Sequence, residues 1–236
     1  MRRVIAFDVN ETLLDLGALD PLFRRAFGDA TARGEWFNQV IELAITATAS
    51  NVYFDFAVVG DAALTMVAAR RNVDLLPTAR AAIVGGMRTL PPYPDVRPGL
   101  DRLRDAGFRL AALTNSSSDA ADAQLGHAGV RGYFEQVLSV DRVRRLKPAP
   151  EVYLMAATSL GVSVGAMRLV AAHSWDVAGA LRAGCAAAFV RRPGKVLDPL
   201  APAPDVVGPN LEAVAAGIVA AEGYDRVPRW SDPGPT

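Results

Sequence analysis

Short apolar runs recur along the chain, and most are bounded by glycine or polar residues. Runs of this length that are rich in β-branched side chains are typical of strands buried on both faces of a parallel sheet. They predict strands over residues 3–8, 110–114, 137–140, 168–171 and 187–190.

Helical patterns follow the later strands, and most of them stop at a glycine. Leu100 and Leu103 lie in a predicted helix over residues 95–106, which Gly107 ends. Further helices are predicted over residues 118–128, 150–160 and 176–183, and Asn210 is a predicted cap for a last helix through residue 221. Strands that alternate with helices predict an α/β fold, a Rossmann-like parallel sheet with helices on both faces. Ligands bind such sheets outside the carboxyl ends of the strands.

Residues 15–90 break this alternation. They contain no clear strand, and their pattern predicts helices over residues 19–27, 35–48, 61–70 and 78–87. The stretch Pro91-Pro92-Tyr93-Pro94 is a predicted hinge. We therefore expect a helical cap of residues 15–90 inserted into a catalytic core of residues 1–14 and 91–223. The proline-containing tail of residues 224–236 is expected to be poorly ordered.

Composition excludes some classes of function. The chain is 51 % apolar and 21 % charged, and 25 basic side chains balance 25 acidic ones. A formal net charge of zero argues against a bulk electrostatic role on nucleic acid or anionic membranes. No apolar stretch reaches the length of a membrane span, and Cys185, the one cysteine, cannot form an intramolecular disulfide. We expect a cytoplasmic protein that binds neither nucleic acid nor membrane.

Polar side chains follow four of the predicted strands. Asp8 ends the first strand, Thr114-Asn115-Ser116 ends the second, Lys147-Pro148 follows the third, and His173-Ser174-Trp175-Asp176 follows the fourth. Each of these alone has a plain structural explanation, since a strand-end Asp often caps a helix and a lone Lys is usually solvated. All four in this order are hard to explain as structure alone, and they predict an active site.

With these motifs the chain resembles the haloacid dehalogenase (HAD) superfamily, and within it the L-2-haloacid dehalogenases. The resemblance runs over about residues 3–211. It is carried by the segments FDVNETL at 7–13, PPYPDV at 91–96, LTNS at 113–116, KPAPEVY at 147–153 and WD at 175–176. It implies a HAD-like core with an inserted cap.

The resemblance also implies roles for the residues that match. Asp8 would be the nucleophile of a two-step displacement through an ester intermediate. Thr12 and Thr114 would orient carboxylate oxygens, although both also suit a turn. Lys147 would place a positive charge beside Asp8. Asp176 would orient Lys147 and help to activate the water that hydrolyses the ester, a role compatible with capping the following helix.

Asn10 departs from the phosphatases of the superfamily. Those enzymes place a second Asp two residues after the nucleophile, where it protonates the departing alcohol. A carboxamide cannot do so, whereas a halide leaving group needs no proton. Asn10 therefore favours carbon–halogen cleavage. The dehalogenase type usually has an aromatic residue followed by Gly here, whereas this chain has Asn10-Glu11.

The expected cap arginine is also missing. In the L-2-haloacid dehalogenases an Arg of the cap meets the substrate or halide, and the matching position falls near Phe37 or Asn38. No Arg lies between Gly34 and Val52. The halide must then meet other donors, for which we expect Asn115, His173 and Trp175. The full predicted set for substrate or halide binding is Asn10, Phe37, Asn115, Tyr153, His173 and Trp175; Phe37 is equally explained as cap core.

Ala171 and His173 stand where the dehalogenase type commonly has Ser and Asn to hold the water. Ala171 cannot do that. His173 can hold it, donate to a halide or act as a base, and a loop histidine bonded to backbone is an equal alternative. His127, the other histidine, is interpreted as structural, and Cys185 as a buried core residue.

The sequence thus predicts hydrolysis of a short 2-haloalkanoate to a 2-hydroxy acid, with no metal and no other cofactor. The partner is a small halogenated carboxylate, and a homodimer is allowed. Two alternatives stay open. One is a Mg²⁺-dependent phosphatase using Asp8, the Asn10 carbonyl and Asp176, and the other is a non-catalytic binding protein on the same scaffold.

Overall fold

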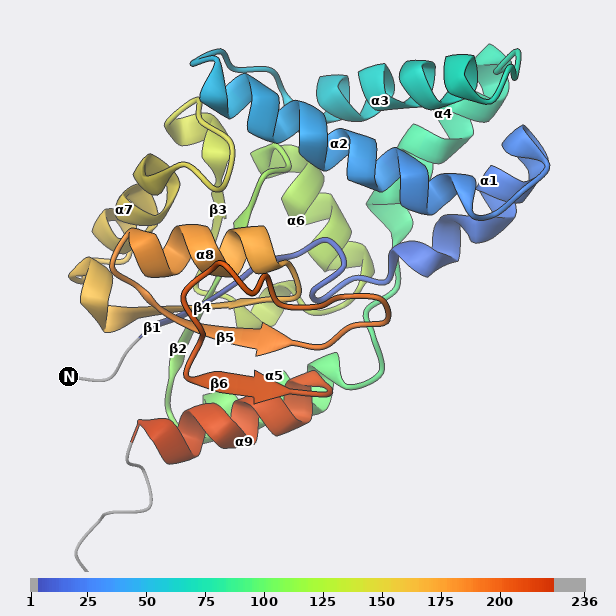
Figure 1. Ribbon diagram of the computed structural model, residues 1–236. Coiled ribbons are helices and arrows are strands. Elements are labelled where there is room, and N and C mark those ends of the chain that lie inside the picture. Colours follow the sequence, from blue (N-terminus) through green and yellow to red (C-terminus); the bar gives the residue numbers. More distant parts are fainter. Residues whose placement is uncertain (1–3, 223–236) are drawn as a thin grey trace, which may run out of the picture.

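The computed structural model describes residues 4–222 and contains one six-stranded sheet in the order β3-β2-β1-β4-β5-β6 (Figure 1). All neighbouring strands run parallel. The strands are β1 (Val4–Phe7), β2 (Arg109–Thr114), β3 (Gln136–Ser139), β4 (Met167–Ala171), β5 (Ala186–Val190) and β6 (Val206–Gly208). The predicted Rossmann-like α/β fold is confirmed. The predicted tail of residues 224–236 lies outside the described residues.

The first five strands fall where the apolar runs predict them, but β6 was missed. It is only three residues long, and Val207 on this edge strand is partly exposed, so it lacks a distinct apolar run. β1 lies inside the sheet between β2 and β4, and all four of its side chains are fully buried. Parallel pairing brings the carboxyl ends of β1, β2 and β4 to one edge.

The core helices are α5 (Val96–Asp105), α6 (Ser118–His127), α7 (Pro150–Ser159), α8 (Ser174–Arg182) and α9 (Leu211–Ala221). Short 3-10 turns accompany them: η3 (Arg131–Tyr133), η4 (Val140–Arg142) and η5 (Val164–Ala166). Figure 1 shows α8 on one side of the sheet and α5 and α9 together on the other. Gly129 and Gly161 follow α6 and α7 with positive φ of 65° and 68°, which glycine adopts without strain. The Asn210 side chain accepts from Ala213 N–H at 2.9 Å and caps α9 as predicted.

The segment between β1 and α5 is helical, as predicted. It contains η1 (Leu16–Leu19), α1 (Asp20–Phe27), α2 (Ala32–Ala49), α3 (Phe56–Arg70), α4 (Pro77–Gly86) and η2 (Met87–Thr89). Figure 1 shows α1 to α4 gathered on one side of the molecule. Trp36 of α2 donates to the Gly60 carbonyl of α3 at 2.8 Å and joins the two helices. α3 starts earlier than predicted because the Asp55 side chain caps it through Ala57 N–H.

This helical segment leaves and rejoins the sheet at one place. Asp15 N–H donates to Pro91 O at 2.9 Å, and Tyr93 N–H donates to Leu13 O at 3.0 Å. Arg192, which follows β5, lies over the Tyr93 ring at 3.9 Å and donates to the Thr12 carbonyl at 2.8 and 3.0 Å. The two chain crossings are therefore tied to each other and to the sheet.

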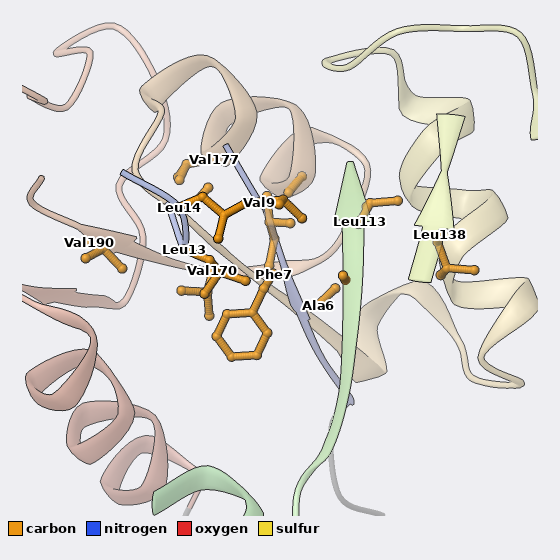
Figure 2. Close-up of a cluster of buried hydrophobic side chains, with 14 of the residues drawn as sticks. Ala6, Phe7, Val9, Leu13, Leu14, Leu113, Leu138, Val170, Val177 and Val190 are labelled. Atoms are coloured by element: carbon orange, nitrogen blue, oxygen red, sulfur yellow. The ribbon is translucent and has the colours of Figure 1, made fainter. Parts of the chain in front are cut away.

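A continuous apolar core supports the first strand and the loop after it. Figure 2 shows Phe7, Val9 and Leu13 packed with side chains of neighbouring strands, among them Val170 of β4. The backbone N–H of Leu13 donates to Val9 O at 2.9 Å, and the next N–H of this loop donates to the same oxygen. The buried loop thereby holds the residues that follow β1 in fixed positions. Among the described residues, no helix has the length and apolar character that crossing a bilayer requires.

Candidate active site

Asp8 lies directly after β1 and is 6 % exposed. Its Oδ1 accepts from Lys147 Nζ at 3.2 Å, and its Oδ2 accepts from the Thr12 hydroxyl at 2.7 Å. His173 Nδ1 lies 3.2 Å from the same Oδ2. Burial alone would raise the pKa of Asp8, but the charge of Lys147 and the hydrogen bond from His173 outweigh it and hold this pKa well below its usual range. Asp8 is therefore a carboxylate at neutral pH, the form that a nucleophile requires.

Thr12 is fixed in place by Ala172, the residue directly after β4. Its buried hydroxyl accepts from Ala172 N–H at 2.9 Å while it donates to Asp8. Both hydrogen-bonding roles of the hydroxyl are therefore used. The structure thus places Thr12 where its predicted role requires it.

Lys147 lies between two carboxylates. Its Nζ is 2.7 Å from Asp176 Oδ2 and 3.2 Å from Asp8 Oδ1, and its side chain is fully buried. Burial lowers the pKa of Lys147, but the two carboxylates outweigh it and raise this pKa, so the ammonium stays charged. The Asn115 side chain accepts from Lys147 N–H at 2.9 Å and fixes the lysine backbone.

Asp176 is fully buried in the first turn of α8. One carboxylate oxygen accepts from Lys147, and the other accepts from the Tyr153 hydroxyl at 2.6 Å. Burial and the nearby charge of Asp8 raise the pKa of Asp176, although Lys147 opposes the shift. The predicted capping alternative is wrong, because α8 starts at Ser174 and His173 occupies the cap position. Tyr153 contacts Asp176 and thus supports the lysine, whereas the sequence assigned it to substrate binding.

Thr114 and Asn10 contact other groups. The Thr114 hydroxyl was predicted to orient carboxylate oxygens. It accepts from Ser116 N–H at 3.1 Å, and within residues 4–222 no hydrogen bond joins it to a carboxylate. Asn10 donates to the Ser116 hydroxyl at 3.2 Å and accepts from Gln124 of α6 at 3.2 Å. Gln124 also donates to Met87 O at 2.8 Å, which links this network to the helical segment.

His173 is held on both ring nitrogens. Nδ1 faces Asp8, and Nε2 lies 3.0 Å from Glu11 Oε2. The ring stacks on Trp175 with centroids 5.1 Å apart, and the Phe37 ring lies 5.8 Å away. Burial lowers the pKa of His173, but hydrogen bonds to Asp8 and Glu11 outweigh it and raise this pKa.

Glu11 and Lys195 belong to this cluster and were missed as site residues. Glu11 has a positive φ of 57°, a left-handed conformation that few non-glycine residues adopt. Lys195 Nζ lies 2.5 Å from Glu11 Oε2, and Arg33 Nη1 lies 3.7 Å from Oε1. The hydrogen bond with His173 and the charge of Lys195 lower the pKa of Glu11 despite its burial. The one sequence signal was the unusual Asn10-Glu11 pair; nothing in the sequence pointed to Lys195.

Phe37 lines two hollows. The first has a volume of about 120 Å³ between the helical segment and α6, and its apolar wall contains Trp36, Phe37, Val40, Phe56, Val84 and Met87. Ser116, Gln124 and Arg88 also line it. The second has a volume of about 250 Å³, and Phe37, Ile41, His173, Trp175 and Lys195 line it. Within residues 4–222, no three His, Cys, Asp or Glu side chains are grouped as ligands for a metal ion.

Comparisons with known proteins point to one family. The model of the haloacid dehalogenase-like hydrolase family matches residues 2–184. An (S)-2-haloacid dehalogenase of Pseudomonas sp. (strain YL) is 30 % identical over 93 % of this chain and 95 % of its own length. Haloacetate dehalogenase H-2 of Moraxella sp. (strain B) is 29 % identical over 89 % of this chain and 95 % of its own. The structure of L-2-haloacid dehalogenase from Xanthobacter autotrophicus with chloropropionic acid covalently bound has a TM-score of 0.85 and 25 % identity, covering 94 % of this chain and 99 % of that one.

Proposed function

This chain belongs to the haloacid dehalogenase-like hydrolases, and from that premise we propose that it hydrolyses a short 2-haloalkanoate to a 2-hydroxy acid and halide. The observation that carries the proposal is Asp8, a buried carboxylate held by Lys147 and Thr12 at the end of β1. The names of the relatives support the reaction, and the covalently bound acid in the Xanthobacter structure supports an ester intermediate.

The proposed first step is displacement at C2 of the substrate. An Asp8 oxygen attacks the carbon, the carbon–halogen bond breaks with its electron pair, and an ester and a halide ion form. The fixed charge of Lys147 orients the nucleophile and offsets its repulsion by the substrate carboxylate. No proton is transferred in this step, which agrees with an amide at Asn10.

The second step is hydrolysis of the ester. Water attacks the carbonyl carbon of the Asp8 ester, the 2-hydroxy acid leaves, and the Asp8 carboxylate returns. The hydroxyl oxygen of the first product is then an original Asp8 oxygen. Asp176 contributes by holding Lys147, as the 2.7 Å contact supports.

We propose that residues 15–90 act as a cap and that the 120 Å³ hollow beneath it receives the substrate chain. The apolar wall and small volume favour a short alkanoate over a long one. Asn115 and Trp175 are proposed donors to the departing halide. Asn115 accepts from the Lys147 backbone through its oxygen, which leaves its NH₂ group to donate.

The setting of the enzyme follows from the same features. We propose a cytoplasmic enzyme without nucleic-acid partners, supported by the balanced charge and by a buried free Cys185. The exposed side chains of Val52, Phe54 and Val58 support pairing of two copies, which sedimentation would test.

Product analysis tests the proposal. The enzyme is incubated with racemic 2-chloropropionate and, separately, with p-nitrophenyl phosphate, and halide and phosphate are both measured. We expect halide release only, its loss in Asp8→Asn, and normal release in the surface control Asp122→Asn. In ¹⁸O water under single-turnover conditions the first hydroxy acid should carry unlabelled oxygen. Full labelling would mean direct attack by water and would overturn the ester.

A further inference from the structure

The ester intermediate of the proposed function needs a base, and Asp176 is poorly placed to supply it. Both of its oxygens accept hydrogen bonds from buried donors, Lys147 and Tyr153, and its side chain is fully buried. A base must reach the water that attacks the ester. These contacts suit Asp176 to positioning Lys147 rather than to taking up the proton of that water.

His173 meets the geometric requirement. Its Nδ1 lies 3.2 Å from Asp8 Oδ2, in the group that becomes the ester, and the ring lines the 250 Å³ hollow. That hollow is large enough for several water molecules. Glu11 lies 3.0 Å from Nε2, so a carboxylate fixes the ring and stabilises its charged form.

The charges around His173 explain how it could change state during turnover. Asp8 and Glu11 face the ring from the loop after β1, and Lys195 from the loop after β5 and Arg33 from α2 contact Glu11. Phe37 and Trp175 cover the ring with uncharged groups. Two carboxylates raise the pKa of His173 in the resting enzyme, which favours the imidazolium. Esterification removes the charge of Asp8, so only one of the two carboxylates that stabilise the proton on His173 remains charged.

Resting on the proposed function, we propose that His173, oriented by Glu11, is the general base that hydrolyses the Asp8 ester. Ester formation neutralises Asp8, and the His173 imidazolium releases its Nδ1 proton to solvent. The neutral ring then takes a proton from water as the water oxygen bonds to the ester carbonyl carbon. Collapse of the tetrahedral intermediate expels the 2-hydroxy acid alkoxide, which takes a proton from the imidazolium. The remaining proton of the attacking water passes from Asp8 to His173, which restores the carboxylate and the imidazolium. In total, one haloacid and one water give one hydroxy acid, one halide and one proton.

The test separates the two half-reactions. His173→Asn keeps a hydrogen-bond donor but has no basic nitrogen. Mixed rapidly with excess 2-chloropropionate, it should release about one halide per site and then stall, with the ester visible as added mass on the intact protein. We expect hydrolysis to slow by about 10²-fold or more, the range of a lost general base, while the halide burst changes far less. Glu11→Gln should slow hydrolysis by a smaller factor, and His127→Asn on α6 should behave as wild type.

A measurement on the unaltered enzyme keeps the proposal testable should His173→Asn fail to fold. In weak buffer with a pH indicator, the proton should appear together with the halide burst and before the hydroxy acid. A proton that appears only with the hydroxy acid would overturn the proposed charge change. A normal halide burst with unchanged hydrolysis in His173→Asn would overturn the base while leaving the dehalogenase function intact. Absence of halide release from the wild-type enzyme would overturn the proposed function, and the base with it.

Discussion

Replacing Lys147 by alanine removes a cation that contacts both buried carboxylates of the site. Its Nζ lies 3.2 Å from Asp8 and 2.7 Å from Asp176, and neither carboxylate is more than 8 % exposed at its side chain. The substitution leaves two buried like charges without their shared partner. Either the fold loses stability or one carboxylate takes up a proton.

The structure indicates which of these two responses costs less free energy. Leaving a buried charge unpaired costs about 3–5 kcal/mol. The pKa of Asp176 is already raised by burial and by the charge of Asp8, so Asp176 takes up the proton first and limits that cost. Asp8 keeps its bonds to Thr12 and His173. We therefore expect a folded variant with a lower melting temperature.

Catalysis should suffer more than folding. The attraction between charges 3.2 Å apart is about 5 kcal/mol at an effective dielectric constant of about 20. Losing one preorganised donor of this kind lowers the rate of a chemical step by about 10²-fold or more. The rate to measure is the halide burst under single-turnover conditions, since it reports the attack by Asp8.

Lys147→Arg provides the matched control. It keeps the charge, but a planar guanidinium does not fit the place of a compact ammonium between two carboxylates, so the rate should stay low. A melting curve for each variant separates lost chemistry from lost structure. A wild-type burst in Lys147→Ala would refute the assignment of Lys147 to the reaction.

Three further predictions concern pH, metal and halide. The lowered pKa of Asp8 means that its contribution to stability is present above the unfolded value of 3.8 and is lost as pH falls through the lowered one. From about pH 8 to about pH 5 the nucleophile therefore stays charged and the halide burst should hold, while ester hydrolysis should fall because the proposed base, His173, becomes protonated. A parallel fall of both steps would contradict this. Halide release should survive exhaustive EDTA treatment without acceleration by Mg²⁺, because Lys147 meets the single charge of the substrate; strict dependence on Mg²⁺ with phosphatase turnover would favour the phosphatase alternative. Asn115→Ala and Trp175→Phe should slow halide departure strongly and lower the melting temperature only slightly. A strong fall of both the rate and the melting temperature would assign these residues to structure.

The strands could be predicted because a fully buried strand leaves a plain signal in the sequence. β1 and β4 are buried along their whole length, and both appear as apolar runs. The polar residues that follow them could be placed at one edge of the sheet because parallel strands share their direction. Asp8 and Lys147 are 139 residues apart in sequence. They were expected to meet because both follow parallel strands and because the resemblance to the haloacid dehalogenase superfamily implies that Lys147 lies beside Asp8.

The orientation of side chains was not predictable in the same way. Thr114 ends β2 as expected, yet its hydroxyl turns to Ser116 N–H, which depends on the local conformation of the loop. Lys195 reaches Glu11 across 184 residues, from a loop with neither periodicity nor a motif. Glu11 itself points to His173 from a left-handed conformation that a sequence pattern does not reveal.

The single crossing point between the helical segment and the sheet has a consequence for engineering. Because Asp15 and Pro91 are joined by a 2.9 Å backbone hydrogen bond, residues 15–90 form a cassette whose two ends are neighbours in space. A short linker could replace this cassette, or a related one could be exchanged for it, without stretching the sheet. Asp8, Lys147 and Asp176 all stay on the remaining part, whereas Phe37 leaves with the cassette. The nucleophile thus lies on the retained piece. On the proposed function, exchange of the cassette would change the apolar wall of the substrate hollow together with the contacts of Phe37 to His173 and of Arg33 to Glu11.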